Sequence, residues 1–208
     1  KMTERITFHT VFRSIIERFT SIRGTKRVKP WYGKTLRPGL ELEDGVAMLK
    51  SPEAILKELG LDLPEAPKPL GAYVPVVQTG NLLFLSGMLP LVLGKLQYQG
   101  KLGQDLTVEQ GYESARTAVL NALAAIRQEI GDLSLVARVV RLAGHIASAP
   151  GFTQQPAVLN GASDLLLKIF GERGKHARLA LGSAELPLSS PIELELIVAL
   201  ESTPKTPR

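Results

Sequence analysis

The sequence has 208 residues, contains no cysteine and carries a formal net charge of +5. This length is enough for one domain with a substantial core, or for one domain with an extension. Without cysteine, the chain has no disulfides, thiolate nucleophiles or cysteine-ligated metals. No apolar segment is long enough for a membrane span and no secretory signal follows the start, so we expect a cytoplasmic protein.

The positive charge is concentrated in the N-terminal part of the chain. Residues 1–50 contain eleven basic and five acidic residues, a net charge of +6, whereas the other 158 residues contain fourteen basic and fifteen acidic ones, a net charge of −1. The main body is therefore close to neutral. For this reason we expect no nucleic-acid partner, although the whole chain is basic.

Residues 1–50 are predicted to be a basic extension that is poorly ordered or partly helical. Apolar residues recur at helical spacing over 8–22, and residues 24–40 are a basic linker broken by glycine and proline. Three interpretations remain open: an extension without a fold of its own, a targeting or membrane-surface helix that would indicate an organellar location, and a partner-binding helix. Met48 is an alternative start.

The body begins at about residue 51 with short elements. The sequence predicts a helix over 52–60, a proline-rich connector over 63–71, a hairpin with strands over 73–78 and 82–86 around a turn at 79–81, and a third short strand over 96–99. Pro75 lacks a backbone N–H, which favours an edge position for the first hairpin strand.

Two long helices and a strand follow. Thr107 and Gln110 form a capping box, and Gly131 stops the predicted helix after residue 130. Residues 135–147 are apolar at both alternating sets of positions, as in a central strand that is covered on both faces. A second helix is predicted over 156–170.

The last two strands are predicted over 178–182 and 192–200, as a hairpin with a turn at 187–191. Period-two alternation sets Arg178 and Ala180 opposite Leu179, and sets Glu193 opposite the leucine-rich face of its strand. Arginine is a fixed cation whose forked donors suit carboxylates. We expect these residues, which lie off the leucine faces, to point toward a neighbouring subunit. The alternative is a structural ion pair from Arg178 to Glu193 or Glu195.

The element order predicts an α+β fold with a mixed sheet. Right-handed crossovers would place both long helices on one face of that sheet. The other face also carries apolar residues and has no helix to cover it. This pattern indicates an oligomer that forms through the bare face.

Several short segments resemble the Rid family of reactive intermediate deaminases, also called the YjgF or endoribonuclease L-PSP family. The segments are Gly71-Ala72-Tyr73, Gly80-Asn81, Ser86-Gly87, Ala177-Arg178, Glu185-Leu186-Pro187 and residues 192–195. The resemblance extends over about residues 52–202, which gives a Rid-like domain over 51–203 and a tail over 204–208. The segments NGASDLL and ARLALGSAELP are similar to the chorismate mutase-like branch, a label that describes the fold.

The resemblance implies a homotrimer with a barrel-like core and three clefts between subunits. It implies hydrolysis of enamine or imine intermediates, such as 2-aminoacrylate, to 2-keto acids and ammonia. By resemblance, Arg178 binds the substrate carboxylate, Glu193 orients water, Tyr73 caps the site and Gly87 lets the ligand approach the backbone. Ala180 stands at a substrate-binding position that is often cysteine in the family, which puts the substrate in question.

The chemistry requires no cofactor or metal, because an imine carbon is already electrophilic and water needs only placement and a base. The three histidines are too few and too scattered for a zinc site. His145 is expected to be hydrogen-bonded at an interface or in the core, and His176 to border the cleft. Two other functions remain open: a regulatory trimer that binds a small carboxylate without turnover, and RNA cleavage, against which the neutral body argues.

Overall fold

The computed structural model describes residues 40–43, 46–69 and 71–201, all within one compact unit, Arg37–Arg208. The helix predicted over 8–22 and the tail predicted over 204–208 lie outside the described residues. In chain order the helices and strands are β1 (Leu40–Glu43), β2 (Val46–Leu49), α2 (Pro52–Glu58), β3 (Val76–Thr79), β4 (Leu82–Leu85), β5 (Leu91–Val92), β6 (Lys95–Leu96), α3 (Val108–Ile130), β7 (Val136–Ala147), α4 (Gln155–Phe170), β8 (Ala177–Ser183) and β9 (Ile192–Leu200).

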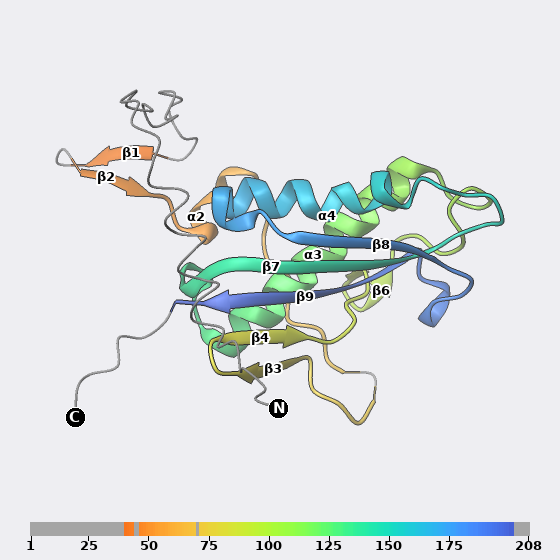
Figure 1. Cartoon of the computed structure of the whole chain (residues 1–208), viewed down its shortest axis with the longest axis horizontal. Helices are drawn as coiled ribbons and strands as arrows, with labels where there is room; N and C mark the ends of the chain where they lie inside the picture. The colour runs from red at the N-terminus through yellow and green to blue at the C-terminus, as the bar shows by residue number, and fades with distance from the viewer. Residues whose placement is uncertain (1–39, 44–45, 70, 202–208) are drawn as a thin grey trace, which may run out of the picture. The chain divides into compact units, whose positions relative to one another are not determined.

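Five strands form one mixed sheet in the order β3-β4-β9-β7-β8, and Figure 1 shows them side by side. Neighbouring strands are antiparallel except β7 and β8, which are parallel. The predicted α+β architecture with a mixed sheet is therefore confirmed. The predicted hairpin of the last two strands is wrong, because β7 lies between β8 and β9.

The first hairpin confirms the edge position that Pro75 predicted. Pro75 directly precedes β3, which is the edge strand next to β4. Gly80 has φ +58° in the turn, a conformation that glycine adopts without strain. The strand begins at Val76 instead of residue 73, so Tyr73 lies in the loop before it.

Helix α3 begins and ends where its sequence predicts. The Thr107 hydroxyl accepts a hydrogen bond from the Gln110 N–H, the Gln110 side chain accepts one from the Thr107 N–H, and Gly131 caps the C-terminus. Helix α4 packs closely on α3 because Gly161 has no side chain: an added Cβ would lie 2.0 Å from the carbonyl oxygen of Tyr112. The two helices therefore meet backbone to backbone at this point.

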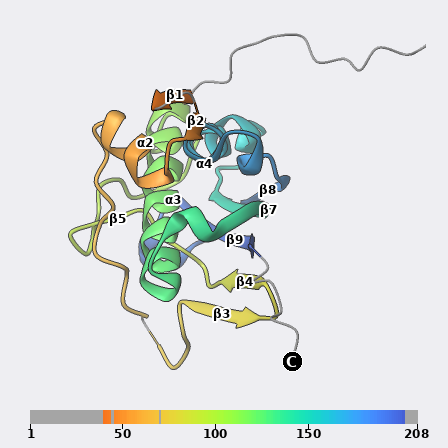
Figure 2. The same ribbon diagram turned by 90° about the vertical axis from the view of Figure 1, so that its left-hand side faces the viewer.

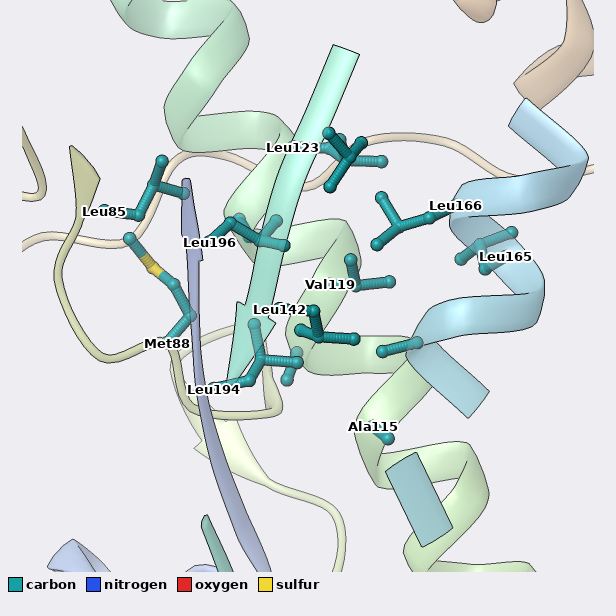
Figure 3. Close-up of a cluster of buried hydrophobic side chains, with 14 of the residues drawn as sticks. Leu85, Met88, Ala115, Val119, Leu123, Leu142, Leu165, Leu166, Leu194 and Leu196 are labelled. Carbon is teal, nitrogen blue, oxygen red and sulfur yellow. The ribbon is translucent and has the colours of Figure 1, made fainter. Parts of the chain in front are cut away.

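Both long helices cover the same face of the sheet, as predicted (Figure 2). Leu194 and Leu196 of β9 and Leu142 of β7 are almost fully buried against them, and Figure 3 shows these side chains directed toward Val119 and Leu166 of the helices. Burying one such side chain is worth about 1.5–3 kcal/mol. This layer is the core of the domain.

The opposite face of the sheet has no helix over it in the described part of the chain. The strand registers place Val77, Phe84, Leu179 and Leu181 on this face. Their exposed fractions range from 40% for Phe84 and Leu179 to 52% for Val77, whereas leucines on the helix-covered face reach zero. We call this surface, defined by these four side chains, the bare face.

Two short hairpins were not predicted. The strand predicted over 96–99 is instead a hairpin of β5 and β6, whose turn residues Leu93 and Gly94 both have positive φ, 50° and 77°. This is the type I′ pattern, which usually carries asparagine or glycine at the first position and is hard to foresee with leucine there.

Strands β1 and β2 pair antiparallel, within the segment that was assigned to the N-terminal extension as poorly ordered or partly helical. The sequence analysis did not predict these strands. None of the helices in the described residues combines the length and the apolar character needed to cross a membrane.

Candidate functional site

A pocket of about 510 Å³ brings together three of the five predicted site residues, Tyr73, Gly87 and Glu193. They come from the loop before β3, the segment after β4, and β9. Most of the remaining wall is apolar and includes Met88 and Pro187. Among the described residues that line it, the pocket is thus an apolar space with one carboxylate, of a size that suits a small organic ligand.

Gly87 and Glu193 lie close together in the pocket. Met88 exchanges two backbone hydrogen bonds with Leu194, of 2.7 and 3.1 Å, and so fixes the residue before it beside Glu193. A Cβ added at Gly87 would lie 1.9 Å from Glu193 Oε1. Only glycine therefore leaves room for the carboxylate in this position.

The environment of Glu193 favours its protonated form. Burial raises the pKa of this carboxyl, His145 opposes the rise by favouring the charged form, and Glu195 adds to it. His145 is the register partner of Glu193 on β7 and is half-buried on the same face. A carboxyl with a raised pKa in a pocket is a candidate for proton transfer.

Tyr73 lies at the exposed side of the pocket, with about half of its surface accessible. Its loop is held to the end of β4 by Ser86, whose hydroxyl donates to the Val74 carbonyl at 2.7 Å and whose N–H donates to the Pro75 carbonyl at 2.9 Å. These bonds connect the predicted Ser86-Gly87 segment to the tyrosine loop.

The sequence analysis missed one polar residue of the pocket. Lys68 lines it from the segment that was assigned as a proline-rich connector. It is the basic residue among the described residues that line this pocket, and it lies between Pro67 and Pro69, which restrict its backbone. A single lysine in a connector carries no sequence pattern, so only the fold reveals its place.

Arg178 and Ala180 do not line the pocket of their own chain. Their register partners on β7 are Leu142 and Gly144, which pair with the buried Leu196 and Leu194 on β9. Both residues therefore lie on the helix-covered side of the sheet, and Ala180 packs against the core.

The prediction that Arg178 and Glu193 both point away from the helices is thus wrong for Arg178. The guanidinium Nη1 donates to Asn160 Oδ1 at 2.6 Å and to Ser163 Oγ at 3.3 Å, both on α4. The alternative ion pair with Glu193 or Glu195 is not formed within the described residues, since β7 separates the two strands. Leu179 and Leu181 take the outward positions instead.

His176, two residues before Arg178, does not line the pocket of its own chain, and its contacts are with Ser163 and Gly174. Its Nε2 is 3.0 Å from Ser163 Oγ and its Nδ1 is 2.6 Å from the Gly174 carbonyl oxygen. Among the residues that the structure describes, no three His, Asp or Glu side chains are grouped so that they could hold a metal ion.

Comparison with known proteins assigns the family. Residues 53–200 match the protein family described as "YjgF/chorismate mutase-like, putative endoribonuclease". The chain belongs to this YjgF family. The match covers β3 to β9, including the pocket residues and Arg178, so the resemblance seen in the short sequence segments is confirmed.

Of two relatives of this YjgF-family chain, one is named without an activity and the other is named as an enzyme. Protein TCP17 of Trypanosoma cruzi is 42% identical over 150 residues, which are 72% of this chain and 94% of that protein. A 2-iminobutanoate/2-iminopropanoate deaminase of Dermatophagoides farinae is 27% identical over 142 residues, 68% of this chain and 95% of that enzyme.

Among solved structures, a "putative endoribonuclease" of Shewanella oneidensis is 42% identical and superposes with a TM-score of 0.71, covering 73% of this chain and all of that one. The YjgF fold is thus supported by sequence and structure together.

Proposed function

We propose that this YjgF-family protein hydrolyses 2-imino acids and their enamine tautomers, such as 2-aminoacrylate, to 2-keto acids and ammonia. The observation that carries the proposal is the Glu193 carboxyl, which has a raised pKa and is lodged against Gly87 in an apolar pocket. The distant relative that is named as an imino-acid deaminase supports this substrate class.

In the proposed reaction, Glu193 moves the proton. Water attacks the imine carbon, its oxygen forms the new C–O bond, and the C=N π electrons move to nitrogen. Glu193 accepts the proton that water loses and returns it to nitrogen. Glu193 then carries the proton of the new hydroxyl group to nitrogen, the oxygen lone pair re-forms C=O, and the C–N bond breaks to release neutral ammonia, so one water is consumed without oxidation or reduction. A raised pKa brings this carboxyl closer to the operating pH, which favours both halves of the transfer.

The substrate carboxylate needs a cation, because it would otherwise be repelled by Glu193 in an apolar pocket. We assign this role to Arg178. Since Arg178 lies across the sheet from the pocket of its own chain, the proposal requires that a second copy supplies it. Tyr73 would cap the ligand from the exposed side, and Lys68 would add positive charge at the wall.

The assembly is proposed to be a homotrimer that buries the bare face. On this face Val77 and Phe84 of β3 and β4 and Leu179 and Leu181 of β8 are exposed apolar side chains that flank β9 and β7 on either side. An apolar surface of this kind on a sheet is typical of an interface. Copies packed through it would bring the β8 edge of one chain toward the pocket of another.

The test is deamination of 2-aminoacrylate generated in situ, followed as 2-keto acid and ammonia formation above the spontaneous rate. Glu193→Gln and Arg178→Ala are expected to reduce the enzymatic rate by about 100-fold or more. Glu195→Gln is the matched control, since it removes a neighbouring carboxylate on the same face of β9 but outside the pocket, and it should retain most activity.

Two results would count against the proposal. The first is activity of Glu193→Gln equal to that of the unaltered protein. The second is an unaltered protein that binds a 2-keto acid in an Arg178-dependent manner but accelerates no imine hydrolysis, which would favour a regulatory carboxylate-binding protein.

A further inference from the structure

The Arg178 guanidinium is held on one side only. Nη1 donates to Asn160 Oδ1 at 2.6 Å and to Ser163 Oγ at 3.3 Å, so both of its hydrogens are engaged. Within the described residues, Nε and Nη2 have no hydrogen-bond partner. The Nε–Nη2 edge is therefore left open, and this edge offers two parallel N–H donors that match a carboxylate.

The support behind Nη1 has a defined hydrogen-bond direction. The Gly174 carbonyl can only accept, so His176 Nδ1, 2.6 Å away, carries the proton that it donates. In the neutral ring Nε2 is then an acceptor, and the Ser163 hydroxyl donates to it at 3.0 Å. The hydroxyl oxygen is left to accept from Arg178 Nη1. Every bond in the series from Arg178 to Gly174 thus points the same way, which strengthens each bond through polarisation.

This series is anchored in rigid parts of the fold. Ser163 is 8% exposed on α4, and Gly174 is buried, where an added Cβ would lie 2.4 Å from the Leu166 carbonyl oxygen. Asn160 lies one turn before Ser163 on the same helix, so both polar side chains reach the same side of α4. Figure 1 shows α4 running alongside β8.

We propose that Asn160, Ser163 and His176 are positioning residues, which hold the Arg178 guanidinium so that its Nε–Nη2 edge faces a substrate carboxylate. The inference rests on the proposed carboxylate-binding role of Arg178. It adds a specific consequence: the three residues determine how tightly the substrate binds and leave the hydrolysis step itself unchanged.

The physical reason is the conformational entropy of arginine. A long side chain on an exposed edge strand samples many rotamers, and fixing it when the ligand binds costs binding free energy. The bonds to Asn160 and Ser163 fix the guanidinium beforehand. Removing either bond restores part of this freedom, which is expected to raise KM about tenfold. The turnover number should change less than about twofold, because none of the three side chains lines the pocket that holds Glu193.

The experiment compares the full chain with its Asn160→Ala and Ser163→Ala variants in three measurements: kcat and KM for 2-aminoacrylate hydrolysis, the Kd of 2-oxobutanoate as a non-reacting carboxylate, and the Tm. Lys168→Ala is the matched control on α4, because Lys168 is exposed and lines a small pocket with Leu59 and Arg116 on the side of α2 and α3. Arg178→Ala gives the reference for complete loss of carboxylate binding.

A rise in KM and Kd with nearly constant kcat in both variants, and no change in Lys168→Ala, supports positioning. If Arg178→Ala abolishes activity but the two variants keep the original KM and Kd, the inference fails and the proposed function stands. If no imine is hydrolysed but 2-oxobutanoate binding weakens in Asn160→Ala, Ser163→Ala and Arg178→Ala, the deaminase proposal fails and the positioning role stands. A fall in kcat and Tm at unchanged KM shows that the bonds to Asn160 and Ser163 only tie α4 to β8, and the positioning inference fails. If the original protein neither binds 2-oxobutanoate nor hydrolyses 2-aminoacrylate, the proposed function and the positioning inference are both overturned.

Discussion

Replacing Gly87 with alanine tests the centre of the candidate site. The added Cβ would lie 1.9 Å from Glu193 Oε1, 2.7 Å from Cδ and 3.0 Å from Cγ. Ordinary contacts between such atoms are about 3.5 Å or longer, so the carboxylate oxygen has to withdraw by roughly 1.5 Å. A displacement of about 1 Å in a reacting group costs around 100-fold in rate. We therefore expect Gly87→Ala to lower kcat/KM for 2-aminoacrylate by about two orders of magnitude.

The fold should tolerate this substitution. The atoms in the way belong to the far end of a half-buried, flexible side chain, and the backbone at Gly87 does not have positive φ. The expected loss of stability is therefore near the lower end of the overpacking range, about 1 kcal/mol. This corresponds to a Tm decrease of roughly 2–4 °C.

The assay combines ammonia release with a thermal melt, and Gly71→Ala is the control. Among the described residues its Cβ would meet the Tyr73 ring alone, at an ordinary 3.5 Å, so both activity and Tm should stay close to those of the original protein. If Gly87→Ala keeps its rate within about threefold while Glu193→Gln loses it, the carboxylate does not act from the position seen here and the geometric reasoning is refuted.

Three further predictions concern pH, packing and assembly. Since burial raises the pKa of Glu193 above its unfolded value, the carboxyl favours the folded state at low pH and loses this contribution as the pH rises through the raised pKa. The unfolding free energy of the original protein should therefore fall relative to that of Glu193→Gln as the pH rises from the unfolded to the folded pKa of Glu193. Parallel curves of unfolding free energy against pH would contradict the raised pKa. Gly161→Ala places a Cβ 2.0 Å from the Tyr112 carbonyl oxygen and should cost about 1–3 kcal/mol, seen as a Tm decrease of several degrees, whereas an unchanged Tm would show that α3 and α4 separate freely. Phe84→Asp on the bare face should leave the circular dichroism spectrum unchanged and shift sedimentation toward the monomer; an unaltered sedimentation profile would exclude this face as the interface.

The sequence predicted those elements whose signals are local. The Thr107 capping box and Gly131 determine both ends of α3, because they satisfy its terminal backbone groups regardless of the rest of the fold. Tyr73, Gly87 and Glu193 were named by family resemblance, and the fold does bring them together. The β5–β6 turn was missed because Leu93 adopts a positive φ that its residue type does not announce.

The error at Arg178 has a different cause. Alternation shows that Arg178 and Leu179 lie on opposite faces, but it does not show which face the helices cover. We assumed that leucines point inward, as they do on β9. On β8 they point to the bare face, and the arginine reaches α4 instead. Lys68 was missed because its role depends on a connector folding over the pocket, a long-range contact without a periodic signal.

These placements couple assembly to the chemistry of Glu193. Leu181, His145 and Glu193 are register neighbours across β8, β7 and β9 on the bare face. A second copy that covers Leu181 also removes water near Glu193, and further burial raises the pKa of a carboxyl unless the partner brings a cation. If Arg178 of that copy enters the pocket, it has the opposite effect and lowers this pKa. The pKa of Glu193 in the assembled protein, compared by NMR titration of the carboxyl with that in the Phe84→Asp variant, therefore reports which charge arrives: a lower pKa on assembly indicates the arginine, and a higher pKa indicates burial alone.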